Sequence, residues 1–244
     1  MKVLDTKTSS ASENMLKDAA LLDELDPKGA PWLHFYRWEG LSATYGYFIQ
    51  PERWFHLDKV SSHGVSLARR PTGGGIVFHI WDFAFSFLMP SGHPAFSMST
   101  LENYRFVNET VLSAVKDLFD LQSPLQLISQ DAPADAWDCT HFCMALPTQY
   151  DVVYQGMKIA GAAQRRRKQG YLHQGTISLA FPDLELLQEI LLSREVIQAM
   201  SSYTFAPLGK KCPTSLLEEA RRSLQERLEQ KFMEKLQQIS YTPS

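Results

Sequence analysis

A short stretch of the chain gathers residue types that could bind an anionic or carbonyl-bearing ligand. It contains Arg69, Arg70, Gly73, Gly74, Gly75 and, four positions later, His79. Successive glycines between two apolar runs cost conformational entropy, and they are tolerated where the backbone takes unusual dihedral angles or where another group must come close. Backbone amides beside arginines can cradle an anion. The alternative is a flexible hairpin turn, and the arginines and the imidazole favour a binding loop over it.

A lysine and a cysteine later in the chain could perform acyl or phosphoryl chemistry beside such a loop. Lys158 follows a turn at Gly156 and enters an apolar run of small residues, which a solvated surface lysine explains poorly. In a cleft its ammonium would stabilise an acyl carbonyl or a phosphate, whereas on an edge strand it would extend to water. Cys143 lies among polar residues where a thiolate could react, although a lone cysteine is more often a small buried residue. The sequence does not determine whether His141 or His173 lies near it.

The hydrophobic pattern predicts the elements that must position these groups. Apolar runs bounded by turn residues predict strands, and apolar residues at helical spacing predict helices. The polar residues 1–12 predict a frayed start. The expected strands are 32–38, 43–49, 65–68, 76–79, 83–89, 125–128 and a β-like unit at 150–180, and the expected helices are 13–25, 51–62, 99–120, 184–192, 195–200 and 214–238.

These elements predict an α+β fold in which a mixed β-sheet is flanked by helices. One long helix stands between two β regions, and the chain has neither an internal repeat nor a linker long enough to divide it. We therefore predict a single domain over residues 1–244. Its core is expected at about residues 13–182, followed by a helical C-terminal segment over 183–244.

The composition of the whole chain excludes several classes of protein. A net charge of −3 and a pI near 6.2 give no reason to expect nucleic acid as a partner. No apolar run approaches the length of a membrane-spanning helix, and residues 1–7 lack the apolar stretch of a signal peptide. The three cysteines are too few to predict a disulfide framework. We expect a cytoplasmic protein with no membrane association and no metal site.

Three blocks of the sequence resemble the signature blocks of the superfamily of lipoate–protein ligase A, octanoyltransferases and biotin–protein ligases. The blocks are residues 69–79, 156–164 and 172–177, and they occur in the family's order and spacing within residues 15–181. The resemblance implies the catalytic-domain fold of biotin/lipoyl protein ligases and a cleft for a lipoyl or octanoyl group. It also implies that Lys158 contacts the acyl carbonyl. The other residues implied to bind substrate are Arg70, Gly73, Gly74, Gly75, Ile76, Val77, Phe78, His79, Gly161, Ala163 and His173.

The surroundings of Cys143 are similar to those of the nucleophile in cysteine-type octanoyltransferases. Pro147 and Tyr150 follow it by four and seven positions, and Asp151 comes next. The resemblance implies that Cys143 accepts the octanoyl group as a thioester, with Lys158 as the second catalytic residue and with no cofactor. Full-length ligases usually carry an added C-terminal domain, and the short segment after the third block also favours a transferase.

Other residues resemble the ATP-dependent ligases more closely. Gly75 stands where the transferase branch often has arginine, and Gln174 stands where much of the family has histidine, with His173 one position early. A lipoate–protein ligase would need ATP and Mg²⁺ to form lipoyl-AMP. A third alternative is a protein that binds acyl groups or lipoyl domains without catalysis, which the presence of Lys158 and Cys143 disfavours.

The resemblance also implies protein partners. The donor would be acyl carrier protein, and the acceptors would be lipoyl domains of 2-oxoacid dehydrogenases or the glycine cleavage H protein. A basic segment, Arg165-Arg166-Arg167-Lys168, could dock these acidic partners by charge complementarity. Equally, it could be a solvated hairpin tip.

Overall fold

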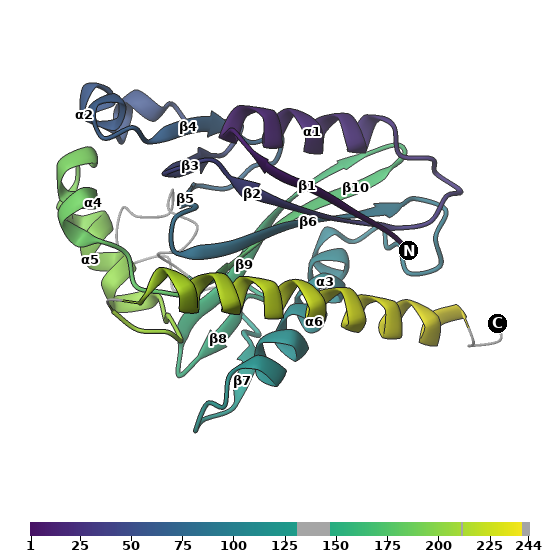
Figure 1. Ribbon diagram of the computed structural model, residues 1–244. Helices are drawn as coiled ribbons and strands as arrows, with labels where there is room; N and C mark the ends of the chain where they lie inside the picture. The colour runs from purple at the N-terminus through teal and green to yellow at the C-terminus, as the bar shows by residue number, and fades with distance from the viewer. Residues whose placement is uncertain (131–146, 211, 241–244) are drawn as a thin grey trace.

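The computed structural model describes residues 1–130, 147–210 and 212–240, and its framework is a seven-stranded mixed sheet (Figure 1). Cys143, Cys139 and His141 lie outside the described residues. In spatial order the strands of the large sheet are β1 (Lys2–Ser9), β2 (Trp32–Trp38), β6 (Asp82–Pro90), β10 (Gly170–Ser178), β9 (Met157–Arg167), β8 (Val152–Tyr154) and β7 (Leu125–Leu127). A smaller sheet consists of β4 (Ser66–Arg69), β3 (Ser42–Tyr45) and β5 (Ile76–Phe78).

Helices cover both faces of the large sheet (Figure 1). On one face α1 (Ala11–Asp23) places Met15 and Leu22 against side chains of β6 and β10. On the other face α3 (Thr100–Leu118) and α6 (Thr214–Ser240) pack on the aromatic residues of β6. The remaining helical segments are a 3₁₀ turn at Pro51–Arg53, α2 (Leu57–Ser62), α4 (Leu184–Ile190) and α5 (Arg194–Tyr203), and α2, α4 and α5 form a second core with the small sheet. Among the described helices, none is both long and apolar enough to cross a bilayer.

The prediction of a frayed N-terminus is wrong, because residues 2–9 form edge strand β1, parallel to β2. The strand carries little apolar alternation, and it is held by backbone pairing and by a hydrogen bond of 2.9 Å between Thr6 Oγ1 and His34 Nε2. Sequence periodicity detects burial, so it misses a strand that is fixed mainly through its backbone. The core also draws on α6, whose Leu224, Leu228 and Phe232 are fully buried. The sheet and its core therefore include residues from outside 13–182.

The strand expected at 43–49 ends at Tyr45, because the chain turns at Gly46 to follow the glycine-rich loop. A Cβ atom at Gly46 would overlap the carbonyl oxygen of Gly74, so only glycine permits this approach. The amide of Gly46 donates to the carbonyl of Gly75 at 3.1 Å, and the amide of Tyr47 donates to the carbonyl of Thr72 at 2.9 Å. Two backbone hydrogen bonds from Gly46 and Tyr47 thus hold the glycine-rich loop in place.

Candidate active site

A β-bulge in β9 decides which face of the sheet carries Lys158. The pairing of β8 with β9 shifts between Val152 and Val153, so one residue is extra on β9. As a result the successive residues Ile159 and Ala160 both enter the main core. A bulge of this kind changes the inside–outside alternation. Lys158 therefore lies on the same side as Gly161, toward the glycine-rich loop.

The ammonium of Lys158 is buried and paired. Its Nζ lies 2.6 Å from Asp151 Oδ2, and the side chains of the two residues are 4% and 0% exposed. Asp151 is held in turn by three donors: the amide of Thr148 at 2.7 Å, the Thr148 hydroxyl at 2.9 Å and the Tyr104 hydroxyl at 2.6 Å. Burial and the Asp151 charge raise the pKa of Tyr104 well above its usual value, so this hydroxyl keeps its proton. The result is a fixed cation inside the fold.

Gly161 makes room for that cation. A Cβ atom at Gly161 would overlap Lys158 Cε and would lie 2.6 Å from Nζ. Real Cβ atoms do not come so close to other heavy atoms. The glycine in the second sequence block is therefore required by the folded-back lysine side chain.

Arg70 organises the glycine-rich loop from within. Its buried guanidinium donates to the carbonyls of Gly73 and Gly75 at 3.0 and 2.8 Å, and to the hydroxyl of Thr44 at 2.9 Å. Gly74 takes a φ of +81°, a left-handed conformation that favours glycine, and it is exposed. These contacts fix the loop through its carbonyl groups.

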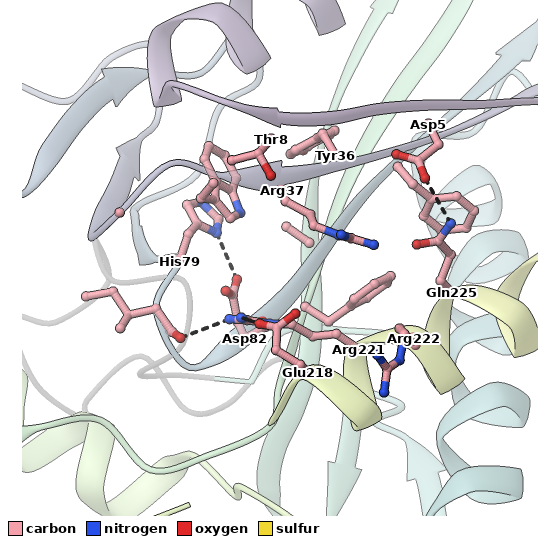
Figure 2. A pocket seen from close by; sticks show the side chains of 16 residues that line it. Asp5, Thr8, Tyr36, Arg37, His79, Asp82, Glu218, Arg221, Arg222 and Gln225 are labelled. Atoms are coloured by element: carbon pink, nitrogen blue, oxygen red, sulfur yellow. Dashed lines mark hydrogen bonds and ion pairs between the residues drawn. The ribbon is translucent and has the colours of Figure 1, made fainter. Parts of the chain in front are cut away.

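His79 and Asp82 form a buried pair at the end of the loop (Figure 2). His79 Nδ1 lies 2.8 Å from Asp82 Oδ2, and His79 Nε2 lies 2.8 Å from Thr44 Oγ1. Thr176 donates to Asp82 Oδ2 at 2.6 Å, and the ring of Trp38 stacks on His79 at a centroid distance of 3.9 Å. A chain of polar contacts therefore runs from Arg70 through Thr44 to the His79–Asp82 pair.

The structure separates the predicted substrate-binding residues. A cavity of about 20 Å³ is lined by Arg70, Val77, His79, Gly161 and Ala163, together with Met15 and Gln174. This volume holds about one water molecule, so an acyl chain requires lining side chains to move. Ile76 and Phe78, in contrast, point away from the cavity into the second core. The structure thus brings five of the predicted residues around one small cavity.

His173 and Gln174 lie on opposite faces of β10. The side chain of Gln174 faces the glycine-rich loop, where it accepts a hydrogen bond from the Thr72 hydroxyl at 2.7 Å and donates one to buried Asp18 at 2.6 Å. His173 lies on the helix side, where its ring packs near Phe85 and Tyr104. Burial lowers the pKa of His173 to about 3, so the ring is neutral. The structure therefore places Gln174 by the cavity and leaves His173 in the core.

The rim of the glycine-rich loop combines positive charge with an exposed aromatic pair. The guanidinium groups of Arg69 and Arg165 lie 5.7 and 5.3 Å from the centroid of the Tyr47 ring, and Arg165 also donates to the carbonyl of Pro71 at 2.8 Å. Phe48 packs edge-on against Tyr47 and is 86% exposed. We call Tyr47, Phe48, Arg69 and Arg165 the rim patch.

Sequence reasoning missed the supporting residues. Tyr104, Thr44, Asp18 and the structural use of Gln174 carry no sequence motif, because each contacts the site across a large separation in the chain. Asp151 was visible only as the acid that follows the cysteine block. Its identity as the partner of Lys158 depends on the bulge and on the pairing of β8 with β9.

Comparison with known proteins places the chain in a family. The model described as "Lipoyl protein ligase A/B catalytic domain" matches residues 10–237. The octanoyltransferase LipM of Lysinibacillus sphaericus is 32% identical over 208 residues, which are 79% of this chain and 70% of that protein. The octanoyltransferase LipM of Geobacillus kaustophilus is 31% identical over 194 residues, 79% of this chain and 68% of that protein.

Solved structures share the fold. The bi-partite lipoate protein ligase of Thermoplasma acidophilum matches with a TM-score of 0.67 and 23% identity over 98% of this chain and 89% of that one. A lipoate-protein ligase A bound with ATP matches with a TM-score of 0.65 and 21% identity over 99% of this chain and 94% of that one. The solved structures confirm the predicted fold class, and the octanoyltransferase relatives confirm the predicted enzyme class, an acyltransferase of protein lipoylation with a lipoate–protein ligase as its alternative. This chain belongs to the lipoyl protein ligase A/B catalytic domain family.

Proposed function

We propose that this protein moves an octanoyl group from acyl carrier protein to Cys143 and then to a lysine of a lipoyl domain. The observation that carries the proposal is the buried Lys158 ammonium, fixed 2.6 Å from Asp151 and packed against Gly161, which lines the small cavity. A cation held in a buried site stabilises the oxyanion that develops during acyl transfer. The octanoyltransferase relatives support the choice of acyl group.

The proposed reaction has two steps of acyl exchange. The Cys143 thiolate attacks the carbonyl carbon of the donor thioester, the tetrahedral oxyanion forms beside Lys158, and the carrier thiolate leaves. The amine of the acceptor lysine then attacks the Cys143 thioester, loses a proton and releases the Cys143 thiolate. The thioester supplies the driving force, so this route uses no ATP and no other cofactor.

Cys143 enters this proposal from its sequence position, because it lies outside the described residues. It precedes Pro147 by four positions, and Thr148 donates through both its amide and its hydroxyl to the carboxylate that holds Lys158. Thr148, five positions after the cysteine, therefore belongs to the lysine site. This continuity supports a nucleophile and an electrophilic cation that act on one carbonyl.

An ATP-dependent lipoate–protein ligase is the second candidate. The specific observation in its favour is Gly75, which belongs to the loop that Arg70 organises and stands where transferases often have arginine. This route would consume ATP with Mg²⁺ and form lipoyl-AMP, with the loop amides facing the phosphate. It would not use Cys143. A non-catalytic binder is disfavoured by the ordered Lys158 site.

We assign the rim patch as the docking site of the acidic donor carrier protein. Within the described residues neither Arg69 nor Arg165 forms an ion pair, so their charge is available to a partner. Phe48 offers an apolar anchor beside them, and an aromatic anchor ringed by arginine is typical of interface hot spots. A donor docked here would deliver its acyl arm next to the glycine-rich loop. The lipoyl domain would follow as acceptor.

The deciding experiment offers the purified protein two sets of substrates. One set is octanoyl-acyl carrier protein and a lipoyl domain without ATP, and the other is lipoate, ATP, Mg²⁺ and a lipoyl domain. We expect modification with the first set and a hydroxylamine-labile octanoyl adduct on Cys143 by intact mass. Cys143→Ser should lose the adduct and nearly all transfer, whereas Cys139→Ser should retain both. Modification only with the second set would replace the transferase by the ligase.

A further inference from the structure

The large sheet splits at one end, and the split opens a second cavity. Strands β2 and β6 pair from Trp32 with Leu88 to Phe35 with Phe85, and in the described structure their pairing goes no further. Beyond Phe35, β2 stays with β1, where Arg37 pairs with Thr8. A cavity of about 310 Å³ lies in this gap and is closed by α6, which places Glu218, Arg221, Arg222 and Gln225 in its wall (Figure 2). This volume is within the range of small-molecule sites.

Arg221 takes the place of the missing strand neighbour. Its guanidinium donates to the carbonyls of Ile80 and Asp82, both at 2.9 Å, and binds Glu218 at 2.6 Å. Alternate carbonyls along a strand edge would otherwise need a ladder partner. The Arg221 side chain is therefore a fixed part of the cavity wall, and it keeps the opening beside it in place.

Two arginines of the cavity wall have no ion-pair partner among the described residues. Each of the three acidic residues in its wall has a partner: Asp5 binds Lys7 at 2.7 Å, Glu218 binds Arg221, and Asp82 binds His79 and Thr176 through Oδ2, while its Oδ1 is buried without a hydrogen bond among the described residues. Arg37 and Arg222 form no ion pair within the described part of the chain, and both line the cavity (Figure 2). Arg37 comes from β2 and Arg222 from α6. Two exposed guanidinium groups from different elements thus line one opening.

We propose that this cavity binds a small organic anion, with a phosphate or carboxylate head on Arg37 and Arg222 and an apolar body in the gap. Guanidinium groups bind such heads with paired hydrogen bonds. Phe35, Phe83 and Trp38 also line the cavity and match an aromatic or alkyl body. The proposal does not depend on the acyl transfer reaction.

The site shares a wall with the acyl cavity. Tyr36, Trp38, His79 and Ala84 line both, and His79 reaches the glycine-rich loop through Thr44 and Arg70. The α6 residues line only the larger cavity, which marks it as a separate site on the α6 side of the sheet. An anion bound there would contact the His79–Asp82 pair from the side opposite the acyl cavity.

The test measures binding of phenyl phosphate to the whole protein by isothermal titration calorimetry, with inorganic phosphate and phenol as half-probes. We expect saturable binding of phenyl phosphate below about 1 mM, at least about tenfold tighter than either half-probe. Arg37→Met and Arg222→Met should each weaken it about tenfold, and added salt should weaken it further. Arg53→Met, a change at an exposed arginine outside the cavity, should leave it unchanged.

Three results would overturn the proposal. They are an absence of saturable binding up to about 10 mM, equal affinity for phenol and phenyl phosphate, and unchanged affinity in Arg37→Met and Arg222→Met. Thermal melting of each variant in parallel shows that it is folded. Arg37→Lys serves as a second variant, since it keeps the charge and loses the paired hydrogen bonds, and its affinity should fall between those of wild type and Arg37→Met.

Discussion

Lys158 and Asp151 form an ion pair of 2.6 Å whose side chains are almost completely shielded from water. Such a pair gives little net stability, because removing both charges from water costs about as much as their attraction returns. Breaking it by removing one partner is costly, about 3–5 kcal/mol, because one buried charge then stands alone. The pair is therefore better explained by the position it gives to the ammonium than by stability. Comparing the removal of one charge with the removal of both therefore separates a loss of catalysis from a loss of stability.

Lys158→Ala should slow acyl transfer strongly and also destabilise the fold. The rate should fall by about 10²–10³, as for the loss of one oxyanion contact. The double variant Lys158→Met with Asp151→Asn leaves no unpaired buried charge, so urea unfolding should show most of the stability restored while activity stays lost. Near-normal turnover in either variant would mean that the ammonium does not act on the acyl carbonyl.

Gly161→Ala should reduce activity by displacing the lysine. The added methyl group would occupy the space of Lys158 Cε, so the ammonium would move out of its place beside Asp151. Gly64→Ala is the matched control, because Gly64 has a φ of +66° and open space around it, so this change strains the backbone far from the site. Steady-state rates and melting temperatures should show Gly161→Ala losing rate and Gly64→Ala losing only stability. Equal loss of rate in both would contradict this account.

The sequence predicted most of the elements and the two blocks that meet at the site. The glycine-rich loop and Lys158 were found because their residue types are unusual for their surroundings. Strand β1 and the bulge at Ile159 were not predicted, because both are defined by backbone pairing, which is only weakly reflected in the pattern of side chains. His173 was assigned to the site from the family block, and the structure places it in the core because alternate residues of β10 face opposite sides.

Phe48→Ala and Arg69→Ala should weaken use of the protein donor and spare a small one. Both residues belong to the rim patch and lie outside the small cavity, so they would contact the carrier protein and not the acyl chain. We expect KM for octanoyl-acyl carrier protein to rise about tenfold, with kcat and the rate with octanoyl-coenzyme A unchanged. Leu216→Ala, which truncates an exposed leucine on α6, is the control and should change neither. A parallel loss with both donors would place these residues in the reaction instead of in docking.

His173 should make the protein less stable as the pH falls from 7 to 5. Its ring is fully buried, the side-chain amide of Gln164 lies 2.9 Å from Nδ1, and in the described structure Nε2 is buried without a hydrogen-bond partner. Burial lowers the pKa of His173 in the folded protein to about 3, whereas an unfolded histidine has a pKa of about 6.5. Between about pH 6.5 and about pH 3, the unfolded chain binds a proton at this histidine and the folded protein does not. The stability contributed by the neutral ring is therefore complete above pH 6.5 and is lost progressively toward pH 3.

The expected loss between pH 7 and pH 5 is about 2 kcal/mol of unfolding free energy from this one group. Urea unfolding at pH 7, 6 and 5 measures it, with His173→Gln as the variant that cannot take the proton. The variant is less stable at pH 7 if the ring fills its site well, but its stability should fall less steeply with acid than that of the wild type. Parallel pH profiles for wild type and His173→Gln would show that the folded protein admits a proton to this ring, which its burial between Phe85 and Tyr104 argues against.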